Sequence, residues 1–366
     1  MTPEKKDLEY LNRYRDCNPI RKDGNLTLVD YNAINFQQFI DLEGKENAIV
    51  FVPMGPLEVH GKYLPLGTDF LESYQGLEIL KDVLKERRSD RNYTIIEFPG
   101  IPLGTGTNRG HPATVHHSKK TYYEVCKNLC DSLVRGGFRK IVLFTFHHGM
   151  IHGYVMEEAA EKIMRKYKKL DVRISSPIHL FAHTVYMEDP KTIFSEYIEK
   201  LEQEPLTEEE LEAINVDHHA GMMEIALIQH LNENLVDPSY KTAPVSREEM
   251  IDQIKGLLIR KYAAHPPCEP FGCGYNADPK FTDNRDWYSL FVEMGKDIVL
   301  KIVDAMFDED PKAFTPYRNL NVWKQYPLGL NIARVLFLGA NTKRNHLILP
   351  IIVALIIIPW LLYFLK

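Results

Sequence analysis

The sequence predicts an α/β fold with three layers, in which helices cover both faces of a mostly parallel β-sheet. Short apolar runs alternate with stretches of helical periodicity along the chain. Strand–helix alternation is typical of parallel sheets that are covered on both faces. A chain of 366 residues is also long enough to bury a large core. We therefore expect one large α/β domain.

Four apolar runs are the strand candidates, and helical patterns lie between them. The strands are expected at 48–53, 94–99, 141–146 and 172–178. The first run is rich in β-branched residues and ends at proline and glycine, as buried parallel strands often do. Helices are expected at 70–87, 118–135, 154–168, 220–231, 247–263 and 287–307. The glutamate-rich stretch 190–216 is interpreted as a solvated helical insertion.

The carboxyl terminus has the composition of a membrane span. Every residue from 347 to 365 is uncharged and nearly all are apolar, and as a helix this stretch would be roughly 28 Å long, about one bilayer core. Lys343 and Arg344 precede it on the side that should stay cytoplasmic. We expect a globular domain at 1–308, a tether at 309–345 and a single-pass transmembrane helix at 346–366. A buried core helix is the alternative.

Charge and cysteine content exclude several classes of protein. The net charge is −6, with lysine and arginine spread along the chain, so nucleic acid is not an expected partner. The five cysteines form no C-x-x-C pair, and their odd number argues against a disulfide framework. A reducing compartment is therefore expected for the globular part.

Three residues of metal-ligand type follow the first predicted strand. Glu58 and His60 are two positions apart, so in extended chain both side chains lie on one face, and Asp69 follows after a turn-rich stretch. Ligands of open α/β sheets gather beyond the carboxyl ends of strands. We interpret the segment as a metal site. A surface loop with no ligand is the alternative.

Two further segments carry candidate ligands. The predicted strand at 141–146 runs directly into His147 and His148. If a helix begins near residue 220, then His219 and Glu224 can face one cleft. Packed or loop histidines are the alternative for the first segment. For the second, Asp217 could instead be a helix cap, and it is also the candidate that would orient His219.

The first segment resembles the signature of the creatininase (creatinine amidohydrolase) family. The matching residues read Gly55-x-x-Glu58-x-His60-Gly61-x-x-Leu64-Pro65-Leu66-Gly67-Thr68-Asp69. The strand ending in His147 and the His219-Ala-Gly-x-x-Glu224 segment follow in the family's order, and the similarity extends from about 30 to about 305. The resemblance implies a three-layer α/β fold, two divalent metal ions (zinc or manganese, with iron possible) and a homo-oligomer, often a hexamer. Members hydrolyse non-peptide C–N bonds in small cyclic amides or formamides.

The resemblance also implies roles for individual residues. Glu58, Asp69 and His147 would hold one ion, and His60 would hold the other, with Asp69 as the bridge. Glu224 is the expected last ligand, and His219 matches the catalytic histidine. The predicted site therefore comprises the metal ligands Glu58, His60, Asp69, His147 and Glu224, the catalytic residues His219 and Glu224, and the substrate-binding residues Thr114, His148 and Asp217.

The pocket residues depart from the family pattern. Most members read Asn-Gly-His-Gly-Gly-Asn where this chain has Thr145-Phe146-His147-His148-Gly149-Met150, so a bulky phenylalanine is expected beside the site. The substrate is therefore not carried over. The predicted function is hydrolysis of a small-molecule C–N bond by a metal-activated water, with the domain anchored to a membrane on its cytoplasmic side. The alternatives are an inactive membrane-tethered scaffold and a dinuclear metallophosphoesterase.

Overall fold

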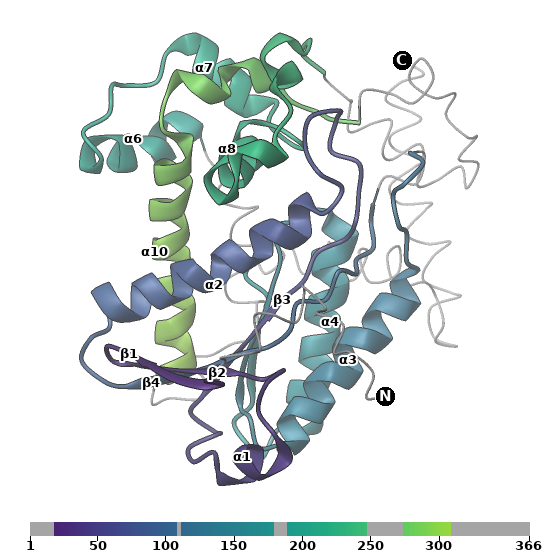
Figure 1. The fold of residues 1–366 in the computed structure, drawn as a ribbon, viewed down its shortest axis with the longest axis vertical. Helices are drawn as coiled ribbons and strands as arrows, with labels where there is room; N and C mark the ends of the chain where they lie inside the picture. Colours follow the sequence, from purple (N-terminus) through teal and green to yellow (C-terminus); the bar gives the residue numbers. More distant parts are fainter. Residues whose placement is uncertain (1–17, 108–110, 179–188, 247–273, 309–366) are drawn as a thin grey trace, which may run out of the picture.

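A mixed six-stranded sheet forms the centre of the molecule (Figure 1). The computed structural model describes residues 18–107, 111–178, 189–246 and 274–308. The strand order is β1-β2-β4-β3-β5-β6, and only β1 pairs antiparallel with its neighbour. The strands are β1 Ile20–Asp23, β2 Leu26–Asp30, β3 Ile49–Pro53, β4 Tyr93–Glu97, β5 Lys140–Phe144 and β6 Arg173–Ser175.

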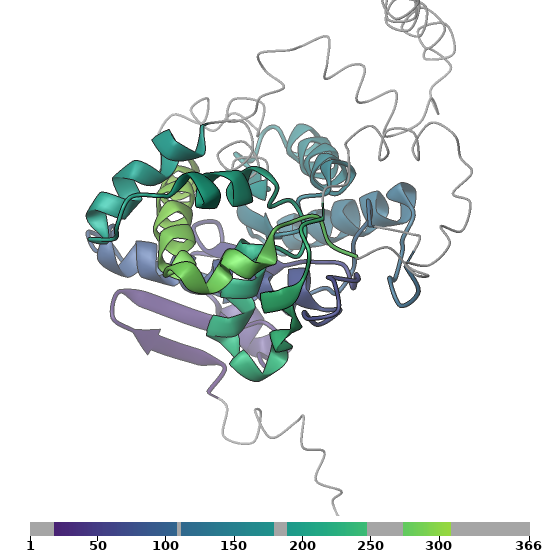
Figure 2. The same cartoon turned by 90° about the horizontal axis from the view of Figure 1, so that it is seen from above.

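Helices cover both faces of this sheet. They are α1 Phe36–Asp41, α2 Thr68–Glu86, α3 Lys119–Arg135, α4 Met150–Lys166, α6 Pro190–Lys200, α7 Glu208–Asn215, α8 Met222–Leu231 and α10 Trp287–Phe307, with 3₁₀ turns η2 Glu233–Leu235, η3 Pro238–Thr242 and η4 Pro279–Asn284. Figures 1 and 2 show α6, α7, α8 and α10 grouped on one side and α3 with α4 on the other.

Strand β3 shows why there are three layers. All five of its residues are buried. Ile49 and Phe51 join the hydrophobic core formed with α2, α8 and α10, whereas Val50 and Val52 join a second core formed with α3 and α4. Because successive strand side chains point to opposite faces, a strand that is apolar at every position must be covered on both.

Most of the predicted elements are present, with two differences. The four predicted strands and the helices corresponding to α2, α3, α4, α8 and α10 are confirmed. The β1–β2 hairpin was not predicted, because β1 consists largely of exposed charged residues. The stretch 190–216 forms α6 and α7, but it is not simply solvated, since Ile193, Phe194 and Ile198 pack into the core beside α10.

Three predicted segments lie outside the described residues. They are the helix at 247–263, the tether at 309–345 and the membrane anchor at 346–366. Within the described ranges, every helix is too short or too polar to cross a bilayer.

Close backbone contacts bring the ends of β3, β5 and α2 together. The Met54 amide donates a hydrogen bond to the Phe144 carbonyl at 2.8 Å. Gly55 packs against the start of α2, where an added Cβ would lie only 2.6 Å from the Asp69 carbonyl carbon. Only a glycine allows this approach. Residues that follow β3 therefore lie next to the first turn of α2.

Candidate metal centre

Six of the predicted site residues converge at the carboxyl edge of the sheet. Glu58 and His60 lie in the loop after β3, Asp69 lies in the first turn of α2, and His147 follows β5. Strands β3 and β5 are parallel neighbours, so their carboxyl ends adjoin. His219, just before α8, and Glu224, in the first turn of α8, reach the same place.

Asp69 faces a histidine on each side. Its Oδ1 lies 3.5 Å from His60 Nε2, and its Oδ2 lies 3.4 Å from His147 Nδ1. His147 Nδ1 is also 3.4 Å from Glu58 Oε2, and His60 Nε2 is 3.8 Å from Glu224 Oε2. These separations are long for hydrogen bonds. They are close to the roughly 3.4 Å expected between ligand atoms that each lie about 2.1 Å from one tetrahedral metal ion.

Three atoms at the middle of this cluster, on His60 and Asp69, are buried and have no hydrogen-bond partner in the part of the chain that the structure describes. His60 is 0% exposed and Asp69 is 1% exposed. His60 Nε2 and both Asp69 carboxylate oxygens accept or donate no hydrogen bond. Buried charged atoms without partners are energetically costly, and a cation between them removes that cost. The residues fit divalent metal ions, in the two ligand groups Glu58–Asp69–His147 and His60–His219–Glu224.

Backbone carbonyls fix the tautomers of two histidines. His60 Nδ1 lies 3.0 Å from the Glu58 carbonyl oxygen, and His219 Nε2 lies 2.8 Å from that of Val59. A carbonyl oxygen can only accept, so each of these nitrogens carries a proton. The other nitrogen, His60 Nε2 or His219 Nδ1, then has a lone pair. Metal-binding histidines are commonly oriented in this way.

Comparison with known proteins places this site in a family. The creatininase family profile, described as creatinine amidohydrolase, matches residues 33–281. The chain belongs to the creatininase family. A comparison with curated proteins gives no significant match.

Solved structures of the creatininase family share the fold. A manganese creatininase has a TM-score of 0.51 at 17% identity, covering 80% of this chain and 100% of the other. A putative creatinine amidohydrolase from Bacteroides fragilis NCTC 9343 has a TM-score of 0.50 at 18% identity, covering 79% and 100%. A mutant creatininase of the Zn-Zn type has a TM-score of 0.50 at 16% identity, covering 81% and 100%.

The electrostatics of this creatininase-family site favour cations. Burial lowers the pKa of His60, but the charges of Asp69 and Glu224 outweigh burial and raise that pKa to about 10. The same balance, again with Asp69, raises the pKa of His147 to about 9. Conversely, the pKa of Asp69 is held well below its usual value: burial raises it, but His60 and His147 outweigh this. The metal-free site therefore binds protons that metal ions would displace.

His219 differs from the sequence-based expectation of a group poised near neutral pH. Burial, together with the positive charge of His60, lowers its pKa to about 4. Its ring lies 4.4 Å from the ring of His60, centroid to centroid. At pH 7 this histidine is therefore neutral, with its proton on Nε2.

The three predicted substrate-binding residues are placed differently from one another. Thr114 Oγ1 accepts a hydrogen bond from the Val59 amide at 3.1 Å, so it supports the ligand loop. His148 is half-buried beside His147. Asp217 Oδ2 accepts a hydrogen bond from the Met223 amide at 3.2 Å at the start of α8. Asp217 thus caps the first turn of α8. Substrate binding by Thr114, His148 and Asp217 stays a prediction.

Phe146 belongs to the protein core. This bulky residue is only 5% exposed, and its ring packs edge-on against Phe144 at 5.2 Å. It joins the hydrophobic cluster that includes residues of α2. That it lies beside the metal site stays a prediction.

One acidic residue of the centre was missed by the sequence analysis. Glu72 is fully buried on α2, and burial followed by the charges of Glu224 and Asp69 raises its pKa well above the usual value. It forms a third group of potential metal ligands with Asp69 and Glu224. The available signal was its spacing of three residues from Asp69 in a predicted helix, which places both on one face.

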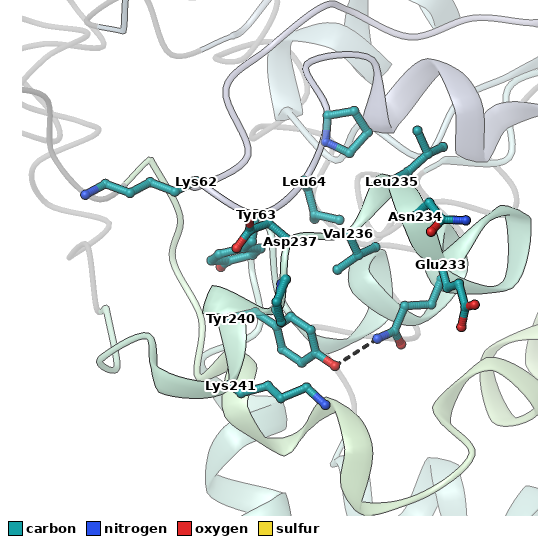
Figure 3. Close-up of a pocket in the computed structure, with 13 residues that line it drawn as sticks. Lys62, Tyr63, Leu64, Glu233, Asn234, Leu235, Val236, Asp237, Tyr240 and Lys241 are labelled. Carbon is teal, nitrogen blue, oxygen red and sulfur yellow. Dashed lines mark hydrogen bonds between the residues drawn. The ribbon is translucent and has the colours of Figure 1, made fainter.

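Figure 3 shows a surface groove of about 650 Å³. It runs between the loop at 62–65 and the turns at 233–241, and its lining residues do not include the six residues that converge at the sheet edge. Tyr63 in its wall donates a hydrogen bond to the Ala220 carbonyl at 2.7 Å. The groove wall therefore supports the segment that carries His219 and Glu224.

Proposed function

We propose that this chain is a metal-dependent amidohydrolase that cleaves a non-peptide C–N bond in a small molecule, either a cyclic amide or a formamide. The observation that carries the proposal is Asp69, whose two buried carboxylate oxygens face two separate sets of ligands. Membership of the creatininase family supports the same reaction class. Zinc and manganese are the proposed ions, since both occur among the structures with this fold.

The residues divide into two ligand sets that share Asp69. Glu58 and His147 would hold one ion, and His60 and Glu224 would hold the other. His219 also lies within ligand distance of His60 and Glu224, but we assign it to proton transfer instead. Two divalent ions supply Lewis acidity, which lowers the pKa of water to about 7 and polarises a carbonyl oxygen. The Ala220 amide donates a hydrogen bond to Glu224 Oε2 and so orients that carboxylate.

Proton transfer is assigned to His219. Because its Nε2 proton is held by the Val59 carbonyl, Nδ1 is the nitrogen that can take a proton. We propose that Nδ1 receives a proton as water is added to the substrate carbonyl and returns it to the departing nitrogen. The low pKa of His219 means that it starts the cycle neutral, as a base must.

Removal of the bridging carboxylate tests this proposal. Asp69→Ala should lose both metal ions and all turnover, because both ligand sets depend on Asp69. Metal content is measured by elemental analysis, and turnover is screened with lactams, cyclic ureides, formamides and phosphoesters. Asp41→Ala, at an exposed position on α1, is the control.

Each result of this screen has a clear meaning. Turnover of an amide by the parent chain and its loss in Asp69→Ala support the proposal. Turnover of phosphoesters alone would favour a phosphoesterase, and metal binding without any turnover would favour an inactive scaffold. An Asp69→Ala variant that retains both ions and activity would refute the proposed centre.

We also propose that the domain is a homo-oligomer, as the family resemblance implies. Residues 346–366 are proposed to anchor the domain to a membrane, with the domain on the cytoplasmic side. The apolar run and the preceding Lys343 and Arg344 support the anchor. The full chain should sediment with membranes, whereas a chain ending at residue 345 should not. A truncated chain that still sediments with membranes would contradict the anchor.

A further inference from the structure

Glu72 presents a buried carboxylate to the metal centre. It lies three residues after Asp69 on α2, so the two side chains share a helix face. Its exposed fraction is 0%, and among the described residues neither of its carboxylate oxygens has a hydrogen-bond partner. Since buried carboxylates normally have at least one donor or counter-ion, this arrangement indicates that a cation completes the environment of Glu72.

The nearest ligand candidates belong to the second ion. One oxygen from each of Asp69, Glu72 and Glu224 lies within 4.8 Å of the other two. Asp69 and Glu224 are also the two acids that approach His60 Nε2, at 3.5 Å and 3.8 Å. Glu72 therefore shares Glu224 with the ligand set of His60, and the group that contains His147 does not include it.

The charges around Glu72 also favour a cation. Three groups of potential ligands contain four carboxylates, those of Glu58, Asp69, Glu72 and Glu224. Two divalent ions would balance the charge of these four groups when all of them are ionised. Without metal ions, the same carboxylates would repel one another at short range in a low-dielectric interior.

Position 149 has no space for a ligand side chain beside His147. An added Cβ at Gly149 would lie 2.6 Å from His147 Nε2. A ligand side chain at this position would force the His147 ring to move. Helix α2 offers a buried carboxylate without such a clash.

We propose that Glu72 is a ligand of the second metal ion, together with His60, Asp69 and Glu224. This inference rests on the metal centre of the proposed function and adds a residue to it. The second ion then has three carboxylates and one imidazole among its protein ligands. An oxygen-rich set suits manganese.

Manganese titration of the full chain tests the assignment. After removal of metal with a chelator, the parent chain, Glu72→Gln and Glu78→Gln are titrated with MnCl₂ in a calorimeter. Glu78 is the matched control, since it is on the same helix but its side chain is 68% exposed. Two ions should bind the parent chain and Glu78→Gln. In Glu72→Gln one dissociation constant should rise at least about tenfold, the scale reported even for outer-shell changes.

A second variant separates ligand loss from misfolding. Glu72→Asp keeps the charge but withdraws the carboxylate oxygens by one methylene. The dissociation constant of its weaker manganese site should therefore lie between the values for the parent chain and for Glu72→Gln. Circular dichroism confirms that each variant is folded. If either folded variant binds two manganese ions with the affinities of the parent chain, the assignment of Glu72 is refuted.

The titration uses no substrate, so the two proposals can fail separately. A parent chain that binds two ions through Glu72 but hydrolyses no amide would refute only the amidohydrolase function. A parent chain that hydrolyses an amide while Glu72→Gln binds metal normally would refute only the Glu72 assignment.

Discussion

Asp69 depends on a glycine in the preceding loop for its position. Gly55 lies against the backbone of Asp69, with no space for a side chain between them. The contact involves backbone atoms, which cannot move as a flexible side chain can. A residue with no direct metal-binding role thus controls where the bridging carboxylate lies.

This contact predicts the effect of a single added methyl group. Gly55→Ala should weaken metal binding and lower the free energy of unfolding by about 1–3 kcal/mol, because overpacking shifts the first turn of α2. Gly67→Ala, in the same loop, is the matched control, since its added Cβ would be 3.8 Å from the nearest side-chain atom. Metal content and denaturant unfolding are the measurements, and equal behaviour of the two variants would contradict the argument.

At the scale of elements, a buried ion pair joins α7 to the segment before α10. Arg285 donates hydrogen bonds to both carboxylate oxygens of Glu210, at 2.9 Å and 2.6 Å. Their side chains are 9% and 4% exposed. Glu210 Oε2 also accepts from the Thr207 amide, completing the capping box of α7. This pair fixes the insertion at 190–216 to the helix that covers the sheet.

The ion pair predicts a pH-dependent contribution to stability. Burial raises the pKa of Glu210, but Arg285 and the Thr207 amide outweigh burial and lower it below its usual value of 4.5. Its stabilisation is therefore fully present above pH 4.5 and is lost as pH falls through the lowered pKa. At pH 7, Glu210→Gln should lower the free energy of unfolding by about 2 kcal/mol, the scale of a charge-assisted hydrogen bond.

Unfolding measured between pH 3 and pH 7 checks this prediction. The difference between the parent chain and Glu210→Gln should become smaller as the solution becomes more acidic. Glu208→Gln, at an exposed position in the first turn of the same helix, is the control. A difference that grows at low pH would contradict the assigned direction of the pKa shift.

At the scale of the whole molecule, the proposed metal ions would join the carboxyl edge of the sheet to α2 and α8. The proposed ligands come from the β3 loop, α2, the residue after β5 and the first turn of α8. The unfolded chain cannot hold these groups together, so ions that bind the folded state stabilise it. Metal removal should therefore affect global stability as well as activity.

Chelation provides the test at this scale. With manganese at about one hundred times its dissociation constant, the expected stabilisation is about 2.7 kcal/mol, or roughly 5 °C in melting temperature for a domain of this size. EDTA should remove this increment from the parent chain. Asp69→Ala should melt at the same temperature with and without EDTA, and an unchanged melting temperature for the parent chain would contradict stabilisation by metal.

Particular residues show how much could be predicted from the sequence. The strands that end before Gly55 and Thr145, and the helices on either side of them, follow from apolar runs and helical periodicity. Glu58, His60, Asp69, His147, His219 and Glu224 could be selected because each follows or begins a regular element. The β1–β2 hairpin could not be predicted, because its charged first strand gives no periodic signal. The burial of α6 was missed, because charged residues alternate with the apolar residues that pack into the core.

The sequence by itself determined the fold class, the family and the residue types of the metal centre, because these depend on local periodicity and on a motif of contiguous residues. Only the tertiary structure decided that Asp69 faces two histidines, that Asp217 caps α8, that Phe146 is in the core and that the buried Glu72 lies close to Asp69 and Glu224. These facts depend on which side chains meet across elements far apart in the chain. Such contacts are fixed by packing, as Gly55 against Asp69 shows, and no local pattern encodes them.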